Sequence, residues 1–409
     1  MADLRIINAN IFTPEGTAAL KGNDMGKLRH IPSGEIEIRN GIIAYAGPMR
    51  DIDLGDIEVY DAKGRATLPG FVDSHTHLVF GGYRPDEFMW RMRGDSYMSI
   101  MERGGGIVNT MKATRQATKD ELKEKTLWHI DQMSRMGVTT VEGKSGYGLD
   151  KDAEIKQLEV MAEINADPER KVDIATTYLG GHALPPEYKG KGEDAYIDFM
   201  TEEMLPAVKG LAENCDIFCE KGVFTIEQSR RMLKAAKEAG FGVKIHADEI
   251  VTTGGAELAA ELQALSADHL LHISEQGIAD LAASATVATL LPLTAFALRE
   301  PFAPGRTMID SGCAVALATD LNPGSCYSGS IPLTFALACI HMGLSVEEAI
   351  TALTLNGAAA IGHADSIGSI EQGKKGDIVI LRSDNINILP YYTGMNCVDA
   401  TIKAGTVLS

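Results

Sequence analysis

The sequence lacks the features of secreted, membrane-spanning and nucleic-acid-binding proteins. No apolar run among its 409 residues reaches the roughly 18 to 20 residues that a membrane-spanning helix needs. The first residues, Met-Ala-Asp-Leu-Arg, do not have the pattern of a signal peptide. Lysine and arginine total 38 against 56 acidic residues, a formal net charge of −18, whereas nucleic acids and anionic membranes bind clustered cations. We therefore expect a cytoplasmic protein without a nucleic-acid or membrane partner.

Cysteines are few and form no paired framework. Scattered cysteines are typical of reduced thiols in a reducing compartment. Cys215 and Cys219 lie on one face of the strand-like run Cys-Asp-Ile-Phe-Cys, but no second pair accompanies them. Buried structural thiols are therefore favoured over a metal knuckle. The six cysteines are Cys215, Cys219, Cys313, Cys326, Cys339 and Cys397.

The two ends of the chain have the pattern of short β-strands. The dipeptide Asn40-Gly41 between two apolar runs is a strong signal for a two-residue hairpin turn. We predict that residues 1–67 and 365–409 form one small composite β-sandwich domain, which leaves 68–364 as the catalytic domain. The strand-like runs cover residues 4–11, 36–39, 42–45, 377–381 and 398–403.

The middle of the chain alternates apolar strand-like runs with helix-like segments. Strands with crossover helices predict an α/β fold, and eight of them predict a closed parallel (β/α)8 TIM barrel with its active site at the C-terminal strand ends. The eight runs cover residues 71–77, 138–142, 172–179, 216–220, 242–246, 265–269, 286–291 and 314–319. Helical spacing relates Leu122, Thr126, Ile130 and Met133, and also Ile155, Leu158 and Met161.

Polar side chains that can bind a metal stand at the predicted strand ends. His75 and His77 are two residues apart, so on a strand they would point to one face. One such pair is a weak signal, but further candidates follow four other predicted strands, and imidazole suits zinc and similar metals. These further candidates are His182, His246, His269 and Asp320.

The chain resembles the amidohydrolase superfamily of metal-dependent hydrolases. The resemblance rests on Pro-Gly-Phe-Val-Asp-Ser-His-Thr-His at residues 69–77 and on the strand-end residues. Within it, longer strings resemble the members that hydrolyse 4-imidazolone-5-propanoate to N-formimidoyl-L-glutamate in histidine degradation. These strings are His77-Leu-Val-Phe-Gly-Gly with Arg84, Gly104-Gly-Gly-Ile, Lys144-Ser-Gly-Tyr-Gly-Leu, His182-Ala-Leu-Pro-Pro-Glu-Tyr, Lys244-Ile-His-Ala-Asp-Glu, Ser266-Ala-Asp-His and Ala318-Thr-Asp-Leu-Asn-Pro-Gly.

The resemblance implies one divalent metal, zinc or iron, on four ligands: His75, His77, His246 and Asp320. Relatives with two metals carry a carboxylated lysine at the end of the fourth strand. Here Glu220 takes the corresponding position, and Lys221 is one residue out of register. We therefore expect a single metal per chain.

The resemblance also implies catalytic roles. A metal-activated water attacks the ring carbonyl, Asp320 accepts its proton, and His269 polarises the carbonyl. Glu249 contacts the ring nitrogen that departs. A surface carboxylate is the alternative interpretation of Glu249.

An anionic substrate requires a local cation in this acidic chain. By resemblance, Arg84 binds the propionate, since a guanidinium matches a carboxylate with two hydrogen bonds. The remaining implied substrate contacts are Tyr97, Tyr147, His182, Glu249, Asn322, Gly324 and Ser325. The resemblance further implies a homodimer.

Two other functions are alternatives to hydrolysis of the imidazolone ring. A related aminohydrolase could deaminate a different ring with the same metal ligands, but Arg84 and the string at Lys144 favour the propionate substrate. A non-catalytic barrel acting as a scaffold is the second alternative. Such relatives usually lose metal ligands, and this chain retains all four.

Overall fold

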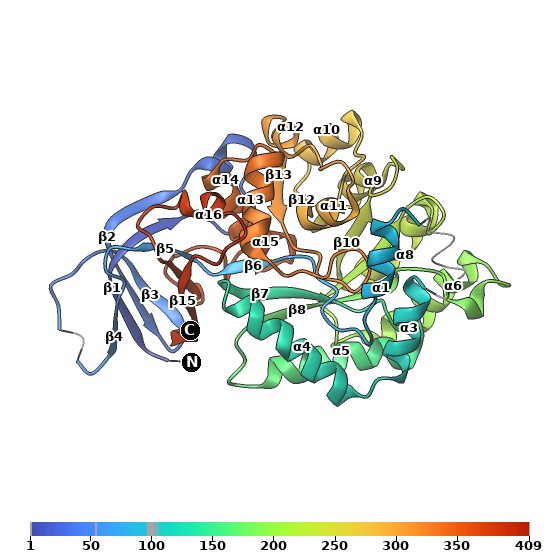
Figure 1. Cartoon of the computed structure of the whole chain (residues 1–409), viewed down its shortest axis with the longest axis horizontal. Coiled ribbons are helices and arrows are strands. Elements are labelled where there is room, and N and C mark those ends of the chain that lie inside the picture. The colour runs from blue at the N-terminus through green and yellow to red at the C-terminus, as the bar shows by residue number, and fades with distance from the viewer. Residues whose placement is uncertain (1, 54, 96–102, 104, 409) are drawn as a thin grey trace.

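The structure is a computed structural model that describes residues 2–53, 55–95, 103 and 105–408. Figure 1 shows a β-sheet at one end, which contains both termini, beside a larger body of strands surrounded by helices. Tyr97, an implied substrate contact, lies outside the described residues. Within these residues, no helix has both the length and the apolar character needed to cross a bilayer.

The eight predicted barrel strands are confirmed. They pair in parallel in chain order, from β6 to β13, so that each strand lies beside the next one in the sequence. Helices between them supply the crossovers (Figure 1). The strands are β6 Phe71–Asp73, β7 Val138–Lys144, β8 Asp173–Gly181, β9 Asn214–Cys219, β10 Gly242–Ala247, β11 Ser266–His269, β12 Val287–Leu290 and β13 Ala314–Leu317.

The first strand is shorter than predicted, because its continuation pairs with the segment after β13 and so closes the barrel. β6 ends at Asp73, so the prediction that it reaches His77 was wrong. Asp73 accepts hydrogen bonds from the backbone N–H of Thr319 at 2.9 Å and from its hydroxyl at 2.6 Å. Beyond the strand, the N–H of Asp320 donates to the carbonyl of His75 at 3.0 Å. Contacts from the first and last strands thus join the two edges of the sheet.

Helices cover the outside of the barrel, and their ends follow local sequence signals. In α4, the hydroxyl of Thr118 accepts from the N–H of Glu121, whose carboxylate accepts from the N–H of Thr118. The spacing that predicted α4 and α5 is confirmed, since Leu122, Ile130 and Leu158 are buried. The helices are α1 Pro85–Met92, α3 Ile107–Gln116, α4 Lys119–Ser134, α5 Lys151–Ala166, α6 Glu193–Phe199, α7 Leu205–Val208, α8 Ile226–Glu238, α9 Gly255–Glu261, α10 Glu275–Ala283, α11 Pro292–Leu298, α12 Gly305–Asp310, α13 Ile331–His341, α14 Val346–Ala352, α15 Leu355–Ala360 and α16 Ile388–Tyr391, with short 3-10 or π turns η1 Gly22–Gly26, η2 Pro186–Tyr188 and η3 Met200–Met204.

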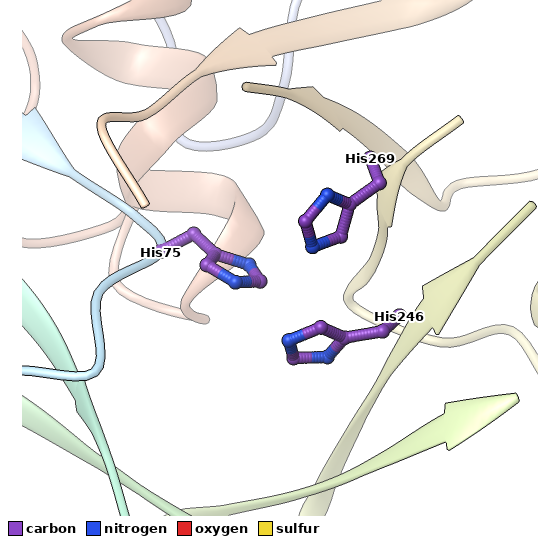
Figure 2. Close-up of side chains that lie close together, drawn as sticks. All are labelled: His75, His246 and His269. Carbon is purple, nitrogen blue, oxygen red and sulfur yellow. The ribbon is translucent and has the colours of Figure 1, made fainter. Parts of the chain in front are cut away.

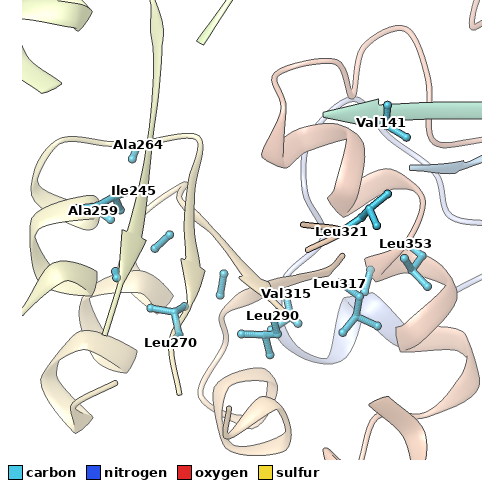
Figure 3. Close-up of a cluster of buried hydrophobic side chains, with 14 of the residues drawn as sticks. Val141, Ile245, Ala259, Ala264, Leu270, Leu290, Val315, Leu317, Leu321 and Leu353 are labelled. Carbon is cyan, nitrogen blue, oxygen red and sulfur yellow. The ribbon is translucent and has the colours of Figure 1, made fainter. Parts of the chain in front are cut away.

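The main hydrophobic core lies between the barrel strands and these helices. Figure 3 shows part of it, with Ile245 of β10, Leu290 of β12 and Val315 of β13 among the buried side chains. Cys215 and Cys219 are buried in the same core as free thiols, as predicted. This packing fixes the strands whose ends carry the polar residues.

The two ends of the chain form one composite mixed sheet, in agreement with the strands predicted at both ends. β14 from the C-terminal segment pairs with β5 from the N-terminal segment. Asn40 and Gly41 have φ of 49° and 80° between β2 and β3, as a two-residue hairpin turn requires. We propose that the domain comprises residues 1–67 and 365–409. Its strands are β1 Leu4–Thr13, β2 Arg29–Arg39, β3 Ile42–Pro48, β4 Glu58–Asp61, β5 Ala66–Pro69, β14 Ile378–Leu381, β15 Val398–Lys403 and β16 Thr406–Val407.

Candidate active site

Four histidines and one aspartate converge inside the C-terminal mouth of the barrel. Nε2 of His75 and Nε2 of His77 lie 3.6 and 3.5 Å from Oδ1 of Asp320. Nε2 of His246 lies 3.5 Å from Nε2 of His77. Figure 2 shows the rings of His75, His246 and His269 directed toward one another from three different strands or their extensions. The predicted strand-end residues are therefore brought together, even though His75 and His77 lie beyond β6.

These residues fit a divalent metal. Three sets of donor atoms each lie within 4.8 Å of one another among the described residues. Two of them are at the mouth, from His75, His77 and Asp320 and from His75, His246 and His269, and the third joins His75 to Glu142 and Asp268. Nε2 of His75 and Oδ1 of Asp320 are buried without a hydrogen-bond partner. Burial lowers the pKa of His75, His77 and His269 well below the usual value, so these rings are neutral, as a metal ligand must be.

Buried carboxylates orient two of these histidines from behind. Nδ1 of His75 lies 2.6 Å from Asp268, and Nδ1 of His246 lies 3.0 Å from Asp216. A carboxylate on one ring nitrogen fixes the tautomer that presents the other nitrogen to a metal. Burial opposes the charged form of His246, but Asp216 outweighs it and raises the pKa of this ring.

The two carboxylates belong to a buried cluster of five charged side chains. Nζ of Lys144 lies 2.6 Å from Asp216, 3.0 Å from Glu142 and 3.6 Å from Asp268. Nζ of Lys244 lies 3.6 Å from both Glu142 and Asp268. All five side chains are 0% exposed, so the two ammonium groups and three carboxylates interact with one another rather than with water. We refer to these residues as the buried charge cluster.

The sequence interpretation missed the buried charge cluster, although a signal was present. Its members stand inside strands that otherwise read as apolar, where Lys, Asp and Glu are almost never buried unless paired. In the sequence, Lys144 is identified only as part of the string Lys144-Ser-Gly-Tyr-Gly-Leu. Five charges inside buried strands would have indicated a paired network beneath the site.

Asp320 has one oxygen directed at the histidines and one held by the protein. Oδ2 accepts a hydrogen bond from the hydroxyl of Thr294 at 2.6 Å, and Thr294 was not identified from the sequence. Burial raises the pKa of Asp320 to about 6. A buried carboxylate with a free oxygen beside neutral imidazoles favours a bound cation.

Glu249 lies next to His269 rather than at the surface. Its carboxylate is 3.6 Å from Nε2 of His269, and its side chain is only 16% exposed. Burial, with a further contribution from Asp320, raises the pKa of Glu249 to about 8. Glu249 is therefore a carboxylic acid near neutral pH. The position near the mouth favours the functional interpretation over the surface carboxylate.

The position at the end of the fourth strand is occupied by a carboxylate with other partners. Glu220 accepts a hydrogen bond from the N–H of Ile250 at 2.9 Å. Lys221, beside it, is exposed. Among the described residues, none of the three groups of possible metal ligands includes Glu220.

Three of the implied substrate contacts line the same mouth. The ring of His182 stacks on His77, with centroids 4.9 Å apart, and lies 5.1 Å from the ring of Tyr147. Burial raises the pKa of Tyr147, and the nearby Arg84 guanidinium opposes that rise. Nη1 of Arg84 lies 3.5 Å from Glu87.

The loop after Asp320 is shaped by Asn322. Its side-chain oxygen accepts from the N–H groups of Gly324 and Ser325 at 2.8 Å, and its amide donates to the carbonyl of Asp320. A Cβ on Gly324 would collide with the Arg84 guanidinium, so glycine permits this close approach. The contacts of this loop with a substrate stay a prediction.

Comparison with known proteins places the chain among hydrolases. The model of the amidohydrolase family matches residues 66–408. The chain is 68% identical over 409 residues to the imidazolonepropionase of Phocaeicola vulgatus, covering 99% of each. It is 63% identical over 409 residues to the imidazolonepropionase of Bacteroides thetaiotaomicron, covering 98% of each.

Among solved structures, a similar one is the 5-methylcytosine deaminase from Klebsiella pneumoniae liganded with 5-fluorocytosine. The TM-score is 0.76, and the match covers 99% of this chain and 97% of that one. The sequences are 17% identical, so this likeness concerns the fold alone.

Proposed function

The chain belongs to the amidohydrolase family, and from that premise we propose that it hydrolyses the ring carbon–nitrogen bond of 4-imidazolone-5-propanoate to give N-formimidoyl-L-glutamate. The single observation that carries the proposal is the high identity to two imidazolonepropionases over at least 98% of the chain. The reaction adds one water across the bond between the ring carbonyl carbon and its nitrogen. The activity is a step of histidine degradation, and we propose a cytoplasmic homodimer.

The family is metal-dependent, and we propose one zinc or iron ion per chain, held by His75, His77, His246 and Asp320. Such an ion, when bound, lowers the pKa of water toward about 7 and so supplies a nucleophile at neutral pH. Lys221, the residue nearest the position of a carboxylated lysine, is exposed. Elemental analysis of the purified protein is expected to return one metal per chain, and two per chain would contradict the proposal.

Three side chains at the mouth supply the proton transfers and the hydrogen bond to the oxyanion. Asp320 accepts the proton of the attacking water, since its carboxylate lies within 3.6 Å of the imidazoles that surround the reaction centre. His269 is neutral and can donate a hydrogen bond to the developing oxyanion. Glu249, 3.6 Å from His269, is protonated and can give its proton to the departing ring nitrogen.

The pH dependence of activity tests the role of Glu249. Its pKa of about 8 means that the acid form predominates below that pH and is lost as pH rises through it. We expect kcat/KM, which reports the free enzyme, to fall above pH 8, and Glu249→Gln to lower kcat/KM by on the order of 10²-fold because the amide cannot give up a proton. Profiles of kcat/KM against pH for both proteins provide the measurement. An unchanged high-pH limb in the variant would assign that limb to another group.

Replacement of Arg84 tests the carboxylate contact. Arg84→Met is expected to raise KM by at least about tenfold, since a charge-assisted hydrogen bond contributes about 1.5–3 kcal/mol. Metal content should not change, because Arg84 is not among the proposed metal ligands and a guanidinium has no acceptor atom to offer a metal. Steady-state kinetics with elemental analysis measures both quantities. An unchanged KM would refute the assignment.

The proposed reaction itself is tested with enzymatically generated imidazolone propionate. Loss of imidazolone absorbance without release of ammonia is expected. Removal of the metal with a chelator should abolish this loss of absorbance. Release of ammonia from a purine or pyrimidine would instead indicate a deaminase. Metal-replete protein that hydrolyses no imidazolone would favour a non-catalytic role.

A further inference from the structure

A second arginine lies beside Arg84 at the mouth of the barrel. Arg84 immediately precedes α1, and Arg91 is two turns further along, on the same side of the helix. Both guanidinium groups approach Gly324. Nη1 of Arg91 lies 3.5 Å from the carbonyl of Gly324, and a Cβ at that residue would collide with Arg84. The helix and the loop after β13 therefore bring two cations together.

The two guanidinium groups have few acceptors among the described residues. Within that part of the chain, Nε of Arg84 and both Nε and Nη2 of Arg91 are buried without a hydrogen-bond partner. The carboxylate recorded beside the pair is Glu87, 3.5 Å from Arg84, and its oxygens also accept from the N–H of Gly106 at 2.9 Å and the amide of Asn109 at 3.2 Å. Buried donors of this kind cost free energy until an acceptor reaches them.

The local charge matches a substrate with one carboxylate. Two guanidiniums and one carboxylate leave one excess positive charge in a partly buried place, with Arg84 and Glu87 side chains only 10% and 13% exposed. Burial and the charge of Arg84 lower the pKa of Arg91, so the two arginines do repel one another. A bound anion removes both the repulsion and the unsatisfied donors, and a carboxylate has about four lone-pair sites for them.

We propose that Arg91 is a second carboxylate-binding residue, which together with Arg84 receives the propionate tail of the substrate. This deepens the proposed function and rests on it for the identity of the substrate. Arg91 contributes the part of the selectivity that distinguishes a charged tail from a neutral tail of the same shape. Glu87 limits the net charge, so that one carboxylate neutralises the site.

The test compares an acid with its amide in two arginine variants. Arg91→Met is expected to raise KM for imidazolone propionate on the order of tenfold, with kcat nearly unchanged, and to leave KM for the propanamide analogue nearly unchanged. Arg91→Lys keeps the charge but not the fork and should show a smaller increase. Arg93→Met, at the exposed end of the same helix, is the matched control and should change neither KM. Equal effects of Arg91→Met on acid and amide, or no effect, would overturn the proposal.

Binding of an unreactive ligand separates this proposal from the catalytic one. Imidazole propionate and imidazole propanamide are titrated calorimetrically into the metal-replete protein and each variant. Wild-type preference for the acid, reduced in Arg91→Met and retained in Arg93→Met, supports the proposal even if no hydrolysis occurs. Wild-type protein with no preference for the acid contradicts it.

Discussion

Asp320→Asn is expected to lower kcat by about 10²–10⁴-fold, the range in which a positioned proton acceptor contributes to catalysis. The amide has nearly the same shape but lacks the negative charge and the second acceptor oxygen. The unpartnered Oδ1 faces Nε2 of His75 and His77, so the substitution removes negative charge at the place where the metal is proposed to bind. Metal content, measured by elemental analysis after dialysis against a weak chelator, should fall together with kcat.

Thr294→Val is the matched control for this prediction. It removes the hydrogen bond to Oδ2 of Asp320 but leaves the carboxylate in place. We expect a smaller loss of activity and little loss of metal. If Asp320→Asn kept activity within a few-fold of the wild type, another group would have to accept the proton.

Lys144→Met should destabilise the protein by about 3–5 kcal/mol, the cost of leaving a buried charge without its partner. Burial disfavours the charged form of Lys144, yet Asp216, Glu142 and Asp268 outweigh it and raise its pKa. Without the ammonium, Glu142 and Asp268 keep Lys244 as a cationic neighbour, while Asp216 loses its contact with Lys144. Chemical denaturation monitored by circular dichroism measures the free energy of unfolding.

A surface pair and a compensating change provide the controls. Lys171 pairs with Asp131 where both side chains are partly exposed, so Lys171→Met should cost no more than about 1 kcal/mol. Adding Glu142→Gln to Lys144→Met should recover part of the lost stability, because it removes one uncompensated charge. Equal effects of the Lys144 and Lys171 variants would show that the buried charge cluster is not coupled as described.

Local sequence patterns were sufficient to predict most of the fold. Apolar runs predicted all eight barrel strands, and Asn40-Gly41 predicted a hairpin turn, because burial and turn geometry depend on neighbouring residues. The end of β6 was wrong because the chain from His75 onward pairs with the segment after β13, about as far away in the barrel sequence as possible. Such a partner is invisible to a pattern read over a few residues.

The side chains that contact the site residues could also not be predicted from local sequence patterns. The histidines could be aligned at strand ends from the sequence, but Asp268 reaches His75 across 193 residues and Lys144 reaches Asp216 across 72. Arg91 has the pattern of a solvated charge on a surface helix, and its contact with the distant Gly324 is not visible in the local sequence. The proposed metal ligands and substrate contacts therefore still depend on the experiments above.

Closure of the barrel also bears on how the protein matures in the cell. His75 and His77 leave the ribosome early, but Asp320 comes into place only when the segment after β13 docks onto the continuation of β6. Any ligand set that includes Asp320 is thus incomplete in every shorter nascent chain. Acquisition of the metal would then mark the completion of synthesis and folding of the barrel, and a bound ion would hold its first and last strands together.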